Sequence, residues 1–166
     1  MKPVKKKHQY LLCLLIISIG VFFFFKLLFN SYFTDLNDLE TYTVDKVVDG
    51  DTIKLNNGVT VRLIGIDAPE SVHPDNSKNV PAGTISSEFL RDFIEGKDIQ
   101  IEYDQERTDK YGRTLAYAYY NGVLIEETIL SKGMAKTMFI EPNTRYKNKL
   151  RQVEQEAKDN KIGIWK

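Results

Sequence analysis

The sequence predicts an α+β domain built on a small barrel or curved sheet, preceded by an apolar N-terminal segment. Three observations lead to this fold class. Short runs of alternating apolar and polar residues indicate strands, and a strong turn signal lies between the first of these runs and the next. Three longer segments have helical periodicity or helix-capping residues. The length of 166 residues leaves room for one compact domain and one accessory segment.

The accessory segment is residues 1–30, in which four lysines precede a long apolar run. The run from Tyr10 to Phe29 contains one charge, Lys26, near its outer end. A membrane-spanning helix needs about 20 largely apolar residues, and a lysine near its end can snorkel to the interface. The lysine cluster then predicts a cytoplasmic N-terminus and an extracellular main domain, displayed at the cell membrane by a single span.

An uncleaved anchor is the preferred interpretation, because Asn30-Ser31-Tyr32-Phe33 matches a small-residue cleavage site poorly. Cleavage would instead give a secreted protein. A buried core helix is disfavoured, since the run has no polar face. Residues 31–40 are interpreted as a tether and residues 41–166 as the domain, which lacks cysteine and therefore depends on its hydrophobic core rather than on a disulfide.

The domain begins with strand signals. From Thr41 onwards apolar residues alternate roughly with polar ones, and Asn57-Gly58 then gives a strong hairpin signal. The apolar positions of this region are Tyr42, Val44, Val47, Ile53 and Leu55 before the turn and Val59, Val61 and Leu63 after it. This arrangement is expected to bring the residues on either side of the hairpin together at one end of a curled sheet.

The remaining elements alternate between helices and strands. Helices are predicted over residues 84–95 and 123–131, the second ending at Gly133 as a C-terminal cap, and strands over 99–103 and 115–120. The last helix is expected to follow Pro142-Asn143-Thr144, with Asn143 or Thr144 as its N-cap, and to run to about Asp159.

The charge balance argues against a simple nucleic-acid-binding module. The chain has 23 basic and 23 acidic residues, but five of the lysines belong to the N-terminal segment, which leaves an excess of about five negative charges elsewhere. A non-catalytic nucleic-acid module usually carries a basic surplus. An enzyme needs only a few cations at its cleft, and a bound metal ion can add more charge.

Three short charged segments carry the chemistry: residues 48–52, 62–70 and 107–113. Carboxylates at Asp51 and Asp67 can hold a hard divalent cation, and Glu70 can take a proton from water. The guanidinium groups of Arg62 and Arg113 can neutralise a phosphate as its negative charge increases. Together these groups indicate metal-dependent hydrolysis of a phosphodiester.

Each segment also has a purely structural interpretation. Asp-Gly is common in turns, Pro69 fits a turn with solvated acids, and most arginines form surface ion pairs. An EF-hand is excluded, because Ile53 and Lys54 stand where that loop needs Asp or Asn and Gly. With His73 as the one histidine after the N-terminal segment, a histidine metal site has no second ligand, so an oxygen-ligated ion, calcium, is expected.

In combination, the three segments resemble those of the staphylococcal (micrococcal) nuclease family, over roughly residues 41–165. The resemblance implies a five-stranded OB-fold barrel with about three helices. It also implies calcium-dependent hydrolysis of DNA and RNA, with one calcium ion and 3′-phosphate products. The roles that it assigns are metal ligation by Asp51, Asp67 and the carbonyl of Ala68, general-base catalysis by Glu70, transition-state stabilisation by Arg62 and Arg113, and phosphate or sugar contact by Lys110 and Tyr111.

The chain departs from the family pattern in three places. Ala68 stands where threonine is common, residues 71–84 correspond to a loop that is richer in lysine in relatives, and residues 138–140 replace tyrosines that stack on the base. Phe139 is assigned to substrate contact, since stacking needs only a π face. Met138 and Ile140 are interpreted as core or cleft wall.

The preferred function is therefore a calcium-dependent nuclease displayed outside the cell membrane. The main alternative is a non-catalytic OB-fold module that binds nucleic acid or a protein. A structural protein of the cell surface ranks below both, because it gives the acids and arginines no reason to occur together. A monomer is expected, and the sequence implies no protein partner.

Overall fold

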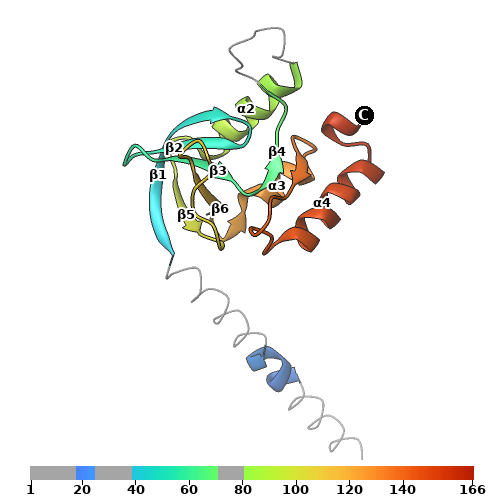
Figure 1. Cartoon of the computed structure of the whole chain (residues 1–166). Coiled ribbons are helices and arrows are strands. Elements are labelled where there is room, and N and C mark those ends of the chain that lie inside the picture. The colour runs from blue at the N-terminus through green and yellow to red at the C-terminus, as the bar shows by residue number, and fades with distance from the viewer. Residues whose placement is uncertain (1–17, 25–38, 71–80) are drawn as a thin grey trace, which may run out of the picture. The chain divides into compact units, whose positions relative to one another are not determined.

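A computed structural model of the protein describes residues 18–24, 39–70 and 81–166. The chain divides into two units, residues 1–38 and 39–166, which are treated separately (Figure 1). The first is described over residues 18–24, which are helical. Most of the predicted anchor and most of the tether thus lie outside the described residues. Within the described ranges, no helix combines the length and apolar character required to cross a membrane.

The second unit contains a closed barrel of five strands, as predicted (Figure 1). Its strands are β1 Glu40–Asp49, β2 Thr52–Leu55, β3 Thr60–Leu63, β5 Asp98–Glu102 and β6 Thr114–Tyr120. The order is β3-β2-β1-β5-β6, and a parallel pairing of β3 with β6 closes the barrel. In this pairing Val61 lies opposite Thr114 and Leu63 lies opposite Ala116. The closed barrel is consistent with the predicted OB-fold.

Alternation of apolar and polar residues explains why these segments form strands around one core. In β1 the side chains of Val44 and Val47 are fully buried, whereas Asp45 and Lys46 between them are exposed. Ile53 of β2 and Val61 of β3 are fully buried as well, and Tyr117 is the largest fully buried side chain. The period of two holds in β2, where Ile53 and Leu55 flank the exposed Lys54, whereas a register irregularity in β1 places two exposed residues between Val44 and Val47.

Three α-helices accompany the barrel within residues 39–70 and 81–166, in agreement with the prediction. They are α2 Pro81–Ile94, α3 Ile125–Ser131 and α4 Lys147–Asp159, and a short 3-10 helix, η2, covers Gly163–Trp165. The predicted glycine cap of α3 is confirmed: Gly133 has a φ of 60°, and its N–H donates to the carbonyl of Leu130 at 2.9 Å.

The predicted start of the second helix, at residue 123, is wrong by two residues. Val123 and Leu124 form a short strand, β7, that pairs with Tyr119 and Tyr120 of β6. The reason is a second hairpin turn at Asn121-Gly122, where both residues have positive φ, 52° and 77°. Asparagine followed by glycine favours this turn, so α3 begins only after the returning strand has ended.

The predicted cap of the last helix is also wrong. The helix α4 begins at Lys147 with Tyr146 as its N-cap and has no side-chain cap hydrogen bond. Asn143 is 3% exposed and pairs instead with the backbone of Glu106. A distant backbone partner therefore competes successfully with the local capping role.

A small two-stranded sheet, which periodicity did not predict, lies beside the barrel. It consists of β4, Gly65–Asp67, and β8, Lys136–Met138, paired antiparallel with Ile66 opposite Thr137. Gly65 has a φ of 86°, and a Cβ added there would come 2.8 Å from the ring of Phe139. The glycine therefore allows the segment after β8 to pack directly against β4.

Glu126, in the first turn of α3, is fully buried, and its carboxylate accepts a hydrogen bond from the Ala118 N–H at 3.2 Å. Burial raises the pKa of Glu126 well above its usual value of 4.5. The folded protein therefore retains this proton over a pH range in which the unfolded chain releases it. Stability is unaffected below pH about 4.5 and decreases as the pH rises towards the folded-state pKa.

Glu126→Gln is expected to stabilise the protein at neutral pH. An amide does not titrate, so it removes the free-energy cost of keeping the buried carboxyl protonated, while its oxygen still accepts from the Ala118 N–H. Between pH 4.5 and the folded-state pKa, the gain can grow by at most about 1.4 kcal/mol per pH unit. Urea denaturation at pH 4, 6 and 8 should show a benefit that grows with pH. Glu88→Gln, at an exposed position of α2, is the control, and a benefit independent of pH would contradict the assignment.

Candidate functional site

One cavity brings the three charged segments together. It has a volume of about 840 Å³ and lies where the β1–β2 turn, strand β4, the loop between β5 and β6 and the segment after β8 meet. Seven of the nine predicted site residues line it: Asp51, Arg62, Asp67, Glu70, Lys110, Tyr111 and Arg113. The expectation that the first two segments meet at one end of the sheet is thus confirmed.

Asp51 lies in the β1–β2 turn with its carboxylate buried against the second segment. Its Oδ2 accepts from the Ala68 N–H at 2.8 Å, and its Oδ1 accepts from the Thr52 hydroxyl at 3.0 Å. Burial raises the pKa of Asp51, although the Arg62 guanidinium and the Ala68 N–H oppose the shift. A Cβ added at Gly50 would come 2.6 Å from the Ala68 Cβ, so only glycine allows this contact.

Arg62, on β3, joins the two carboxylates that the sequence assigned to the metal. Its Nη2 lies 3.3 Å from Asp51 Oδ2 and 3.3 Å from Asp67 Oδ1. Its Nη1 donates to the carbonyls of Leu63, at 3.1 Å, and Ile66, at 2.8 Å. The Arg62 side chain is 10% exposed, so its orientation is determined by these contacts.

Two of the predicted metal ligands, Asp51 and Asp67, line the cavity, whereas Ala68 is buried beside Asp51 and does not line it. The Asp51 and Asp67 oxygens approach one guanidinium nitrogen, and the peptide N–H of Ala68 contacts Asp51. In the described part of the chain, no group of three or more His, Cys, Asp or Glu side chains is arranged to hold a metal ion. Two carboxylates and a backbone carbonyl are hard oxygen donors, so the residues present fit calcium in kind, and water would complete its coordination.

Glu70 is exposed at the cavity wall, and its backbone packs against the start of α2. A Cβ added at Gly83 would come 2.1 Å from the Glu70 carbonyl oxygen and 2.7 Å from that of Pro69. Gly83 therefore allows the first turn of α2 to support the peptide that carries Glu70. Sequence periodicity predicted this helix over residues 84–95, whereas α2 begins three residues earlier and includes Gly83.

Arg113 is oriented by a residue that the sequence analysis did not assign to the site. Its Nε and Nη2 both lie 2.7 Å from Asp109 Oδ2, while its N–H donates to Asp109 Oδ1 at 2.9 Å. These hydrogen bonds and the positive charge of Arg113 lower the pKa of Asp109, although its partial burial opposes the shift. The signal in the sequence was an aspartate at the start of a tight turn, which commonly bonds its own backbone.

Lys110 and Tyr111 form the exposed edge of the same loop. Tyr111 is 73% exposed, and the Lys110 ammonium lies 5.0 Å from its ring centroid. The Arg113 guanidinium lies 5.6 Å from the same centroid. A phenol with two cations beside it can contact phosphate or sugar, so the predicted roles of both residues agree with their positions and stay predictions.

Phe139, which was assigned to substrate contact, lies beside the cavity rather than in its wall. Its ring packs against Gly65, lies 5.9 Å from the Arg151 guanidinium and does not line the cavity. Met138 and Ile140, 39% and 69% exposed, line the cavity on either side of it. Their interpretation as cleft wall agrees with this geometry, whereas substrate contact by Phe139 stays a prediction without geometric support.

The charges around the cavity favour a cation. Among the described residues that line it, three are basic and six are acidic: Asp49, Asp51, Asp67, Glu70, Glu106 and Asp109. An excess of carboxylates repels a phosphate, and a divalent cation would reverse part of this repulsion. Asp49 belongs to the first charged segment but was assigned no role there, and Glu106 lies directly before the third segment, where nothing distinguished it from a surface acid.

The family model described as "Staphylococcal nuclease homologue" matches residues 60–166. The chain is 37% identical to a thermonuclease of Staphylococcus intermedius over 140 residues, which are 82% of each protein. It is 42% identical to endonuclease YncB and to the SPbeta prophage-derived endonuclease YokF, both of Bacillus subtilis. These matches cover 76% and 77% of this chain but only 62% and 45% of the two endonucleases.

Proposed function

Since the chain belongs to the staphylococcal nuclease family, we propose that it hydrolyses phosphodiester bonds of DNA and RNA in a calcium-dependent reaction. The observation that supports this proposal most is the convergence of Asp51, Asp67, Glu70 and two arginines on one cavity. The volume of about 840 Å³ is large enough for a nucleotide unit. The names of the relatives, thermonuclease and endonuclease, agree with this activity.

Each residue has a defined part in the proposed reaction. Glu70 takes a proton from a water molecule, whose oxygen forms a bond to phosphorus while the bond to the 5′ oxygen breaks in line with it. The 5′ oxygen takes a proton from solvent and leaves as an alcohol, and a 3′-phosphate remains. Arg113, aligned by Asp109, and Arg62 face the increasing negative charge on the phosphoryl oxygens.

Calcium would be held by Asp51, Asp67 and the carbonyl of Ala68, and when bound it would polarise a phosphoryl oxygen as a Lewis acid. Threonine is common at position 68 in the family pattern, but the proposed ligand is a backbone oxygen, which alanine also supplies. The chain therefore retains the means to bind the ion. We expect the missing hydroxyl to reduce activity without abolishing it.

The proposal includes a location. Residues 1–30, with their lysine cluster and apolar run, would anchor the chain in the cell membrane with the nuclease domain outside. Millimolar calcium outside cells suits a site with few protein ligands, since extracellular calcium modules bind with dissociation constants of about 10⁻⁴ to 10⁻³ M.

Digestion assays test the proposed function directly. The purified full chain in detergent is expected to cleave single-stranded DNA and RNA with millimolar calcium, to stop when a chelator is added, and to leave 3′-phosphate ends. Cleavage should recover when calcium is restored in excess of the chelator. Binding of an oligonucleotide without cleavage, by correctly folded protein, would overturn the proposal and favour the non-catalytic OB-fold module.

A further inference from the structure

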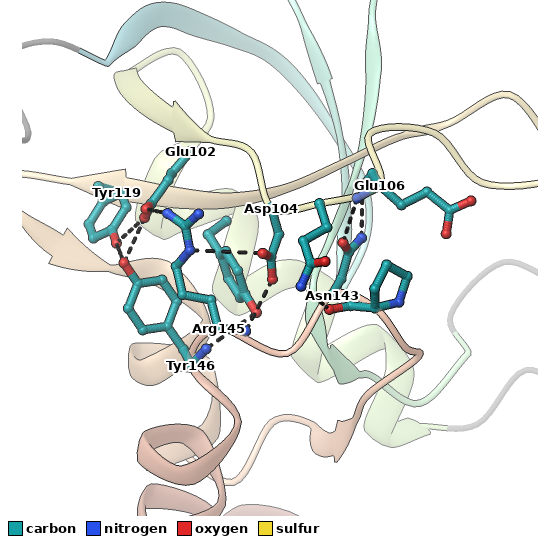
Figure 2. A network of polar contacts seen from close by, with 10 residues as sticks. Glu102, Asp104, Glu106, Tyr119, Asn143, Arg145 and Tyr146 are labelled. Atoms are coloured by element: carbon teal, nitrogen blue, oxygen red, sulfur yellow. Dashed lines mark hydrogen bonds and ion pairs between the residues drawn. The ribbon is translucent and has the colours of Figure 1, made fainter.

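Asn143 is nearly buried beside the cavity and forms a two-way pairing with the backbone of another segment. Its side-chain oxygen accepts from the Glu106 N–H at 2.8 Å, and its side-chain nitrogen donates to the Glu106 carbonyl at 2.7 Å (Figure 2). An amide that satisfies both backbone groups of one residue acts as a strand partner would. Both Asn143 and Glu106 line the cavity.

This pairing belongs to a set of contacts between residues 102–107 and 141–146, the stem of the loop and the lead-in to α4. The Gln105 side chain donates to the Pro142 carbonyl at 3.1 Å, and the Arg145 N–H donates to Asp104 at 3.1 Å. The Arg145 guanidinium also binds Glu102, and Tyr146 donates to the same carboxylate at 2.8 Å (Figure 2). Within the set, the pairing of Asn143 is the one that reaches furthest along the stem towards the catalytic loop.

The loop that carries Arg113 has its own internal structure. The Asp109 N–H donates to the Arg113 carbonyl at 3.0 Å, and the Leu115 N–H donates to the Arg107 carbonyl at 2.9 Å. Its C-terminal end enters β6, which is fixed in the barrel by β3 and β5. Its N-terminal end is tied to the start of β6 by the bond to Arg107 and by an antiparallel bridge between Thr108 and Thr114. Glu106 is the residue directly before this tie, so its pairing with Asn143 adds a second anchor that helps to fix how the loop leans towards the cavity.

We propose that Asn143 is a positioning residue for Arg113: by pairing with the Glu106 backbone, it holds the loop so that the guanidinium faces the cavity. This inference rests on the proposed function, because it assigns Arg113 to the transition state. A displacement of about 1 Å in such a group can cost about 100-fold in rate. Asn143→Ala is therefore expected to lower kcat by 10-fold to 100-fold with a smaller change in KM.

Hydrogen–deuterium exchange of the full chain in detergent provides a readout that does not depend on activity. In Asn143→Ala, amides of residues 106–113 are expected to exchange at least about tenfold faster, whereas those of β1 and β6 keep their wild-type rates. Tyr146→Phe is the matched control, since it removes hydrogen bonds to Glu102 and Tyr119 from the same set but leaves Asn143 intact. It should lower the melting temperature slightly and leave both kcat and loop exchange unchanged.

A loss of global stability is separated from a loss of positioning by sucrose, which favours the folded state. If sucrose restores both the fold and the wild-type kcat of Asn143→Ala, the residue is merely structural and the inference is overturned. Wild-type exchange of residues 106–113 in the variant overturns it as well, whatever the activity. If the wild type cleaves nothing but loop exchange still rises in the variant, the positioning is supported and the proposed nuclease function fails.

Discussion

Replacing Glu70 by glutamine is expected to lower kcat by about 10²-fold to 10⁴-fold, the usual contribution of a general base. The amide has nearly the same shape as the carboxylate but cannot accept the proton of the attacking water. The residue is exposed at the cavity wall, so the substitution should leave the melting temperature within a degree or two of the wild type. Single-turnover cleavage of a fluorescent oligonucleotide with saturating calcium measures the effect.

Glu88→Gln is the matched control for this variant, because Glu88 is exposed on α2 and does not line the cavity. It should cleave at the wild-type rate. Calcium affinity, measured by calorimetry, should be nearly unchanged in Glu70→Gln if Asp51 and Asp67 hold the ion. Cleavage by Glu70→Gln at the wild-type rate would show that another group accepts the proton.

Local sequence patterns predicted the parts of this molecule whose structure is determined locally. The apolar residues Val44, Val47 and Ile53 are buried in the barrel interior, and Asn57-Gly58 turns the chain where expected, with Gly58 at a φ of 86°. The first two charged segments meet, as predicted, because the turn after β1 and the strand β4 are close in sequence to the hairpin that joins them. These predictions needed only periodicity and turn chemistry. The third segment reaches the same cavity through the long-range parallel pairing of β3 with β6.

The features that sequence could not predict depend on contacts between distant segments. Strands β4 and β8 are three residues long and about 70 residues apart, too short for a period to be detected, yet their pairing decides which side chains face the cavity. With Gly65 opposite Met138, the ring of Phe139 packs inward against Gly65, and Met138 and Ile140 line the cleft instead. Asn143 likewise gave a capping signal, but its partner lies 37 residues earlier.

The second large effect is expected at Arg62, which has both a catalytic and an electrostatic part. Arg62→Met should lower kcat by about 10²-fold to 10³-fold through loss of a transition-state donor. It should also destabilise the metal-free protein by about 3–5 kcal/mol, as expected when one partner of a buried ion pair is removed. In the variant, the Asp51 carboxylate, whose side chain is 9% exposed, is left without its guanidinium partner.

Calcium is expected to reverse the stability loss of Arg62→Met in part but not the loss of kcat. A divalent cation between Asp51 and Asp67 replaces the charge of the guanidinium, and it stabilises the folded state in proportion to the logarithm of its concentration. The calcium affinity of the variant should therefore be higher than that of the wild type, since the guanidinium no longer competes for the same two carboxylate oxygens.

Urea denaturation with and without calcium, together with calorimetric titration of calcium, measures both parts in one variant. Arg91→Met is the control, because Arg91 forms a partly exposed pair with Glu95, and such pairs contribute about 0–1 kcal/mol. Calcium should raise the free energy of unfolding of Arg91→Met by the same amount as it raises that of the wild type. Equal destabilisation of Arg62→Met in the presence and absence of calcium would mean that the ion does not bind between these carboxylates, and would move the metal site away from Asp51 and Asp67.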